Sequence, residues 1–207
     1  MVIYNIKVLG FEDAIRGMRN PRNSWWLSDS SVDNNEFTLG DDDFKLLAKL
    51  VRGGAEHRKV LRQIQVNCEI IAPLYWWKQF DTYKVGVSAN STSTMNSITR
   101  DEFRPEMFEL SKDLEYSEAF QAVIKELNEL RELYLEDSGY KQQAFMAMIQ
   151  LLPSSYLQLR TITMTYEALL NICMQRKGHK LPEWKSFVKA MKSEVDYLSV
   201  LMNKARG

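Results

Sequence analysis

A strict two-residue alternation in the middle of the chain constrains the fold most. Between Arg62 and Ile70, apolar residues occupy the even positions from 64 to 70 and polar residues the odd ones. Successive side chains of a strand point to opposite faces of a sheet, so this pattern predicts a half-buried strand with one polar face. Val2–Leu9 alternates well enough for a second strand, which Gly10 ends. A sheet is therefore part of the fold.

The C-terminal half carries helical spacing instead. Apolar residues three and four positions apart predict helices over residues 117–135 and 182–202. Residues 141–174 predict two further helices, separated at Pro153 because proline removes a backbone donor. One early strand, one central strand and helices gathered near the end predict an α+β fold with a small antiparallel or mixed sheet and a helix bundle.

Two polar stretches have the composition of loops. Residues 20–40 are rich in Asn, Ser and Asp, and contain Trp25 and Trp26. Two aromatic side chains in a polar loop favour burial away from water. Internal packing or a subunit contact provides this burial more often than a ligand does. Residues 84–97 follow a helix that Pro73 can open, and their Ser, Thr and Asn residues predict a second loop.

The composition fits one domain over residues 1–207. The chain has 27 basic and 27 acidic residues, so no overall field attracts nucleic acid or an acidic membrane surface. Its two cysteines, Cys68 and Cys173, have no paired ligand spacing, and no apolar run approaches the length of a membrane span. We therefore expect a cytoplasmic protein with neither nucleic acid nor a membrane as a partner.

Few residues could carry chemistry of their own. His57 and His179 are the only histidines and lie far apart, so they form no helical zinc pair. The segment 88–97 offers hydroxyls and amides but no adjacent base to activate a serine. Arg176 belongs to a basic cluster at the expected end of a helix, where the helix dipole favours positive charge. Rigid bidentate binding of a phosphate is an equally good interpretation of Arg176.

The segment 72–80, Ala-Pro-Leu-Tyr-Trp-Trp-Lys-Gln-Phe, resembles the signature helix of the flavin-dependent thymidylate synthases. That helix is followed in the family by Arg-His-Arg, two free positions, Ser, one free, Asn-Glu, one free, Ser, one free and Arg-Tyr. With one residue inserted, six positions of this chain fall on the family's Arg-His-Arg, Ser, Asn and Ser: Thr82, Tyr83, Lys84, Ser88, Asn90 and Ser93. Ser91 and Met95 replace the family's Glu and final Arg.

A second match runs without a gap from Leu152 to Arg176. Asn171 and Arg176 occupy the family's Asn and Arg. In the family, that Arg holds and polarises the deoxyuridylate base, and the Asn lies near the flavin. Thr165 and Glu167, however, stand where the family has Asn and Arg.

The resemblance implies methylation of dUMP to dTMP by a homotetramer, with reduced FAD as hydride donor and with methylenetetrahydrofolate and NADPH as co-substrates. It implies that Arg176 is catalytic. It assigns the pyrimidine nucleotide, dUMP, to Gln79, Ser88, Ser93 and Arg176. It assigns FAD to Asn171, Tyr83, Lys84 and Asn90.

The departures from the family pattern remove positive charge from sites that hold phosphates. Gln63 stands where the family has a flavin-side His, and Glu167 is an acid facing an expected phosphate. Five cations could replace the lost charge, and one of them could pair with Glu167: Arg58, Lys59, Arg62, Lys84 and Arg160. Two alternatives therefore remain beside the family reaction. One is a non-catalytic nucleotide-binding homologue, and the other is a pyrimidine-nucleotide enzyme with a different one-carbon reaction.

Overall fold

The computed structural model describes residues 1–34, 36–136 and 139–205. The chain divides into two compact units, each assembled from separate stretches of sequence. The first unit consists of Met1–Val2, Ile70–Thr82 and Asn90–Thr161. The second unit consists of Ile3–Glu69, Tyr83–Ala89 and Ile162–Gly207. A single domain over residues 1–207 stays a prediction.

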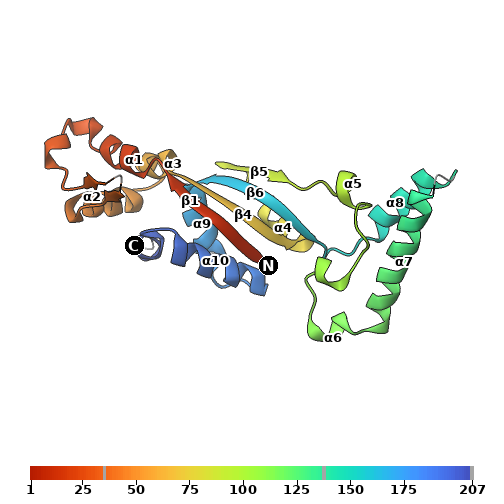
Figure 1. Cartoon of the computed structure of the whole chain (residues 1–207). Helices are drawn as coiled ribbons and strands as arrows, with labels where there is room; N and C mark the ends of the chain where they lie inside the picture. Colours follow the sequence, from red (N-terminus) through yellow and green to blue (C-terminus); the bar gives the residue numbers. More distant parts are fainter. Residues whose placement is uncertain (35, 137–138, 206–207) are drawn as a thin grey trace. The chain divides into compact units, whose positions relative to one another are not determined.

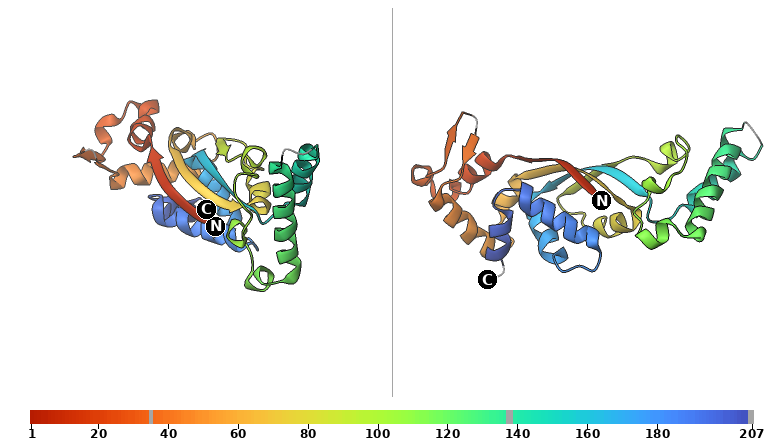
Figure 2. Two further views of the ribbon diagram at one scale, coloured as in Figure 1. Left: turned by 45° about the vertical axis from the view of Figure 1, so that its right-hand side comes forward. Right: turned by 60° about the horizontal axis from the view of Figure 1, so that its bottom comes forward.

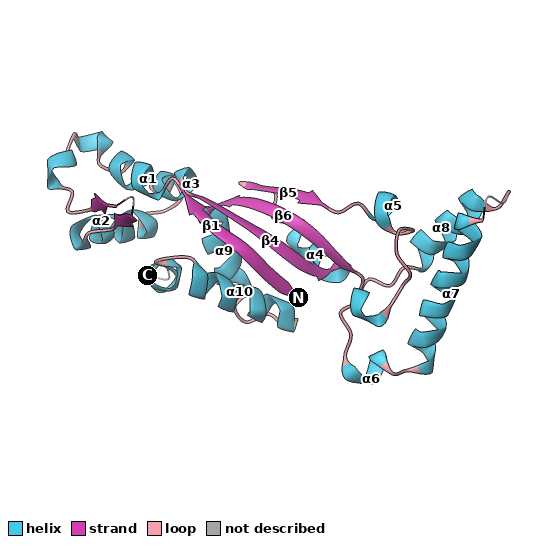
Figure 3. Ribbon diagram, in the orientation of Figure 1, coloured by secondary structure: helices cyan, strands magenta, loops and turns pink. Residues whose placement is uncertain are grey.

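Four longer strands form one antiparallel sheet (Figures 1 and 3). Their order across the sheet is β1 (Val2–Leu9), β4 (Gln65–Pro73), β6 (Leu157–Thr165) and β5 (Val87–Ser91). A separate antiparallel hairpin joins β2 (Ser31–Asp33) to β3 (Glu36–Thr38). The predicted α+β class is confirmed, and β1 occupies the residues predicted for it.

The alternation over residues 62–70 has the predicted cause. Within β4 the side chains of Val66, Cys68 and Ile70 are almost fully buried, whereas Gln65 is exposed and Asn67 and Glu69 are half-buried. Burying three such side chains removes apolar surface from water and stabilises one register of the strand. The pattern therefore identified the strand and its buried face, but Arg62 and Gln63 belong to helix α3 (Lys59–Gln63), and the strand runs on to Pro73.

The strand β6 corrects the prediction of two helices over residues 141–174. The first predicted helix is α8 (Lys141–Leu151), but Leu157–Thr165 is a strand, and α9 (Tyr166–Arg176) begins only after it. Ile162 and Met164 are buried on one face, while the β-branched Thr161 and Thr163 alternate with them. The two-residue alternation of Thr with apolar residues is typical of a strand. It is hard to recognise here because the apolar segments on both sides are helical.

Two other predictions are corrected. The polar stretch 84–97 is not one loop, because it contains β5 and the short helix α5 (Thr94–Ser97). Pairing along the sheet outweighs the weak strand propensity of Ser and Asn in β5. The helix expected over 182–202 is two helices, α10 (Pro182–Glu194) and α11 (Leu198–Lys204), because Tyr197 adopts a left-handed conformation with φ of 61°.

The first unit has its own hydrophobic core. Helix α7 (Glu118–Leu135), which confirms the prediction over 117–135, packs along α8 (Figure 2). The core residues, all nearly buried, are Ile98, Phe103, Phe108, Phe120, Ile124, Leu127 and Met148. The remaining short helices of this unit are α4 (Leu74–Phe80), η3 (Pro105–Met107) and α6 (Lys112–Glu115).

The second unit packs its helices around buried apolar side chains. Its N-terminal helices are α1 (Phe11–Gly17), α2 (Asp41–Arg52) and α3 (Lys59–Gln63), with two 3-10 turns, η1 (Asn20–Arg22) and η2 (Trp25–Leu27). Helix α3 packs against α1 and α9, and α11 packs against α2 and α9. In the part of the chain that the structure describes, no helix has both the length and the apolar character needed to cross a membrane.

A buried carboxylate holds the N-terminal part of the second unit together. Asp43, fully buried on α2, accepts hydrogen bonds from Arg19 Nε at 2.5 Å, Ser28 Oγ at 2.5 Å and Ser30 Oγ at 2.6 Å. Asp29 accepts from the backbone N–H groups of Asp42 and Asp43 and so caps α2. Burial alone would raise the pKa of Asp43, but the bonds from Ser28, Ser30 and Arg19 lower it below its ordinary value.

We predict that Asp43→Ala lowers the free energy of unfolding by about 3–5 kcal/mol, because it leaves the Arg19 guanidinium buried without its partner. The matched control, Asp41→Ala, removes an exposed carboxylate from the first turn of the same helix and costs at most about 1 kcal/mol. Urea denaturation followed by circular dichroism measures both. Because the folded-state pKa of Asp43 is lowered, its contribution is complete at neutral pH and disappears as the pH falls through that pKa. Equal losses in the two variants would contradict the prediction.

Candidate functional site

Thr165 fixes the start of helix α9. Its hydroxyl accepts a hydrogen bond from the N–H of Ala168 at 3.2 Å, and its own N–H donates to the carbonyl of Gly86 at 2.8 Å. Gly86 has φ of 69°, and a Cβ there would lie 2.8 Å from the Thr165 hydroxyl. Only glycine permits this approach, so the turn that carries Tyr83 and Lys84 is anchored beside the start of α9.

Arg176, the last residue of α9, is held by two aromatic side chains. Its Nε donates to the hydroxyl of Tyr83 at 2.7 Å. Its guanidinium carbon lies 4.7 Å from the ring centre of the buried Trp184 and 5.4 Å from that of Tyr83. The Tyr83 hydroxyl donates in turn to Gln175 Oε1 at 3.0 Å. Cation–π contact and a hydrogen bond to Nε restrict the guanidinium to one orientation. These contacts are compatible with both interpretations of Arg176, and its ligand stays a prediction.

The other predicted site residues of the second unit lie on three elements. Lys84 is exposed in the turn after Tyr83, Ser88 is exposed on β5, and Asn171 is half-buried in the middle of α9. The structure joins Tyr83 directly to Arg176. The family resemblance assigns these two residues to different ligands, Tyr83 to the flavin and Arg176 to the nucleotide.

The first unit contains Gln79, Asn90 and Ser93. Gln79 is half-buried near the end of α4, and its carbonyl accepts from the Thr82 hydroxyl at 2.7 Å. Asn90 is exposed on β5. Ser93 precedes α5, and its carbonyl accepts from the Ser97 hydroxyl at 2.7 Å. The assignment of all three to ligands stays a prediction.

Glu167 forms an ion pair with Arg62, which was one of the cations considered as its partner. Arg62 Nη1 lies 3.0 Å from Glu167 Oε2 and also donates to the carbonyl of Ala55 at 2.9 Å. The Glu167 side chain is 14% exposed. Arg62 was a candidate for replacing a lost phosphate-binding cation, and its charge is instead balanced by a carboxylate of the protein.

A second candidate cation, Arg160, is also balanced. In the first unit its Nη1 lies 2.6 Å from Asp81 Oδ1, its Nε donates to Gln158 Oε1 at 3.0 Å, and its guanidinium stacks over the Trp77 ring at 4.3 Å. Gln158, nearly buried, donates to the carbonyl of Thr92 at 2.7 Å. Sequence patterns do not predict this network, because its members come from three separate segments.

Among the described residues, the histidines and cysteines form no metal site and no nucleophilic site. His57 is exposed near Glu56, and His179 accepts from the N–H of Leu181 through Nδ1 at 3.1 Å. No group of three metal-binding side chains occurs in the described ranges. Cys68 and Cys173 are buried, and burial raises the pKa of each thiol to about 12. Neither thiol is a nucleophile in this environment.

We predict that neither cysteine of the native protein reacts with a disulfide reagent such as DTNB at mildly alkaline pH. Both should react after unfolding in guanidinium chloride, because exposure returns the thiol pKa to its ordinary value. The absorbance of the released thiolate measures the count, with glutathione as the reactive control. A rapid stoichiometric reaction of the native protein would show that one thiol is accessible.

The chain has the fold of the flavin-dependent thymidylate synthases, as two solved structures show. Thymidylate synthase X (ThyX) of Helicobacter pylori, in a crystal structure with FAD and dUMP, matches with a TM-score of 0.73 at 16% identity, covering 100% of each chain. A second structure of the Helicobacter pylori enzyme, complexed with FAD and dUMP, gives 0.71 at 16% identity over 98% of this chain and 99% of that one. No protein-family model and no curated protein matches the sequence.

The pyrophosphate of FAD requires donors and positive charge. Glu167 places a carboxylate in the first turn of α9, and Arg62 is already paired with it. The hydroxyl of Tyr83 is already bonded to Arg176 and Gln175. Among the groups considered for the flavin, the charge of Arg62 and the hydroxyl of Tyr83 are therefore engaged within the protein.

Proposed function

We propose that this protein binds a pyrimidine mononucleotide of the dUMP type through Arg176 and does so without FAD. The observation that carries the proposal is the fixed guanidinium of Arg176, bonded to Tyr83 and stacked on Trp184. The proposal is supported by the whole-length similarity to an enzyme whose structures contain dUMP.

A guanidinium that is already oriented binds a planar partner at low entropic cost. Arg176 would donate to a carbonyl oxygen of the pyrimidine ring and draw electron density from it. Lys84, exposed one residue after Tyr83, makes no ion pair within the described ranges, and it would supply charge for the phosphate. Gln79, Ser88 and Ser93 remain predicted nucleotide ligands.

A second candidate function is the family reaction, methylation of dUMP to dTMP with methylenetetrahydrofolate and reduced FAD. The specific observation in its favour is the retention of Asn171 and Arg176 on one helix, within a fold that matches over the whole chain. Homotetrameric assembly and a cytoplasmic location, with NADPH as reductant, belong to this candidate.

We predict that dUMP binds the purified protein and that Arg176→Gln weakens the affinity about tenfold or more, because a hydrogen bond from a charged donor is worth about 1.5–3 kcal/mol. Isothermal titration calorimetry measures the affinity. The control is Lys177→Gln, which removes a neighbouring exposed cation and should leave affinity within about twofold. Unchanged affinity in Arg176→Gln would remove Arg176 from the site.

The two candidate functions differ in their response to flavin. We predict that the protein, incubated with FAD and separated from free FAD by gel filtration, retains no visible flavin absorbance. It should still bind dUMP in the same preparation. Retained flavin bands that shift on addition of dUMP, together with formation of dTMP, would overturn the first proposal in favour of the second. Failure of both ligands to bind would exclude both candidates.

A further inference from the structure

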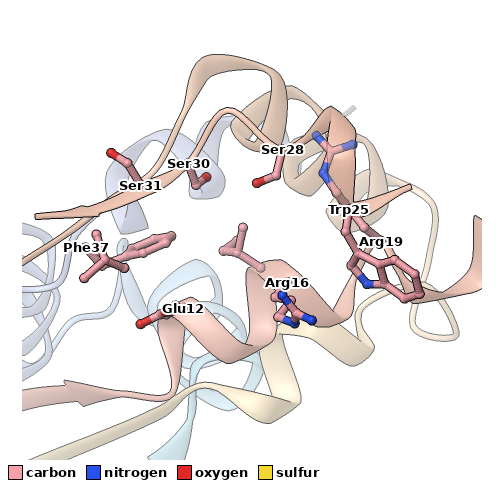
Figure 4. Close-up of a pocket in the computed structure, with 10 residues that line it drawn as sticks. Glu12, Arg16, Arg19, Trp25, Ser28, Ser30, Ser31 and Phe37 are labelled. Atoms are coloured by element: carbon pink, nitrogen blue, oxygen red, sulfur yellow. The ribbon is translucent and has the colours of Figure 1, made fainter. Parts of the chain in front are cut away.

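The N-terminal part of the second unit contains a cavity of about 320 Å³, which no step of the proposed function uses. Helix α1 forms one wall, and the segment from Ser28 to Val32 forms the other (Figure 4). The residues that line the cavity are Glu12, Ile15, Arg16, Arg19, Trp25, Ser28, Ser30, Ser31, Val32 and Phe37. Its volume lies at the lower end of the range of small-molecule sites.

The walls of this cavity are fixed by the buried Asp43 network. Ser28, Ser30 and Arg19, which line the cavity, all donate to the Asp43 carboxylate. The indole N–H of Trp25 donates to Asn20 Oδ1 at 2.8 Å, which holds a ring that is otherwise 41% exposed. A cavity whose polar side chains are already positioned loses little entropy when a ligand binds.

One end of the cavity is basic and aromatic. Figure 4 shows Arg16, Arg19 and Trp25 together at this end. Arg16 is exposed and makes no ion pair among the described residues, not even with Glu12 one helical turn away. Arg19 is nearly buried, and its charge is balanced by Asp43. The guanidinium of Arg16 beside an indole favours an anionic group attached to a planar ring.

The opposite end of the cavity is acidic. There Figure 4 shows the carboxylate of Glu12 with the Phe37 ring, away from Arg16. Glu12 makes no ion pair within the described ranges, and as a carboxylate it can only accept hydrogen bonds. A fully anionic ligand would be repelled at this end, whereas a donor such as an amino group would be bound.

We propose that this cavity is a second ligand site, separate from Arg176, for a small aromatic compound with an anionic group at one end and a hydrogen-bond donor at the other. The carboxylate or phosphate lies at Arg16, the ring lies against Trp25, and the donor lies at Glu12. The polarity of the cavity sets the direction in which the compound binds.

The experiment titrates the whole protein with three single-ring probes: 4-aminobenzoate, benzoate and phenyl phosphate. The quenching of tryptophan fluorescence and calorimetry measure binding. The variants are Arg16→Gln and Glu12→Gln, both exposed positions that leave the Asp43 network intact, with Arg22→Gln as the control because Arg22 is an exposed cation outside the cavity. Benzoate and phenyl phosphate compare a carboxylate with a phosphate, and circular dichroism checks that each variant is folded.

Arg16→Gln should weaken every probe about tenfold, whereas Arg22→Gln should change none. Glu12→Gln should weaken 4-aminobenzoate several-fold and leave benzoate unchanged or tighter, because only the first probe has a donor for Glu12. Absence of saturable binding, or equal effects of Arg16→Gln and Arg22→Gln, would overturn the proposal. So would loss of binding in Arg176→Gln, which would place the probes at the proposed nucleotide site instead. If the Arg16→Gln variant still binds dUMP, the cavity site and the nucleotide site at Arg176 are independent, and each proposal is tested separately.

Discussion

The pairing of β6 into the sheet is the constraint on which the rest of the structure depends. This strand lies between β4 and β5, and its last residue, Thr165, begins helix α9. One residue thus ends a strand through a backbone bond to Gly86 and caps a helix through its hydroxyl. Because a helix continues in the direction set by its first turn, the position of Arg176 follows from that cap.

Two of the arginines considered for phosphate binding are paired within the protein. Arg62 is paired with Glu167, and Arg160 is paired with Asp81. An arginine that balances a protein carboxylate would have to give up that partner to bind a phosphate, and the exposed carboxylate would then repel the same phosphate. The fold alone therefore does not decide which of these arginines can bind a ligand.

Aromatic side chains and a buried carboxylate give the second unit its fixed polar groups. Trp184 and Tyr83 hold Arg176, and Asp43 holds Arg19 with two serines. Each arginine is positioned through a hydrogen bond from Nε. The same contact appears at two places in the unit.

The sequence by itself determined the elements whose period is strict and whose ends carry a stop signal. Strand β4, helix α7 and the start of α10 at Pro182 follow from local spacing, and the resemblance selected Arg176. Only the tertiary structure decided that Leu157–Thr165 is a strand, because mixed Thr and apolar residues acquire a preference when neighbouring strands offer hydrogen bonds. It alone decided the pair between Arg62 and Glu167, which are 105 residues apart. The local period of apolar residues reflects which face of a segment is buried. Ion pairs and cavities depend instead on contacts between segments that are distant in the sequence, and these contacts form only when the chain folds.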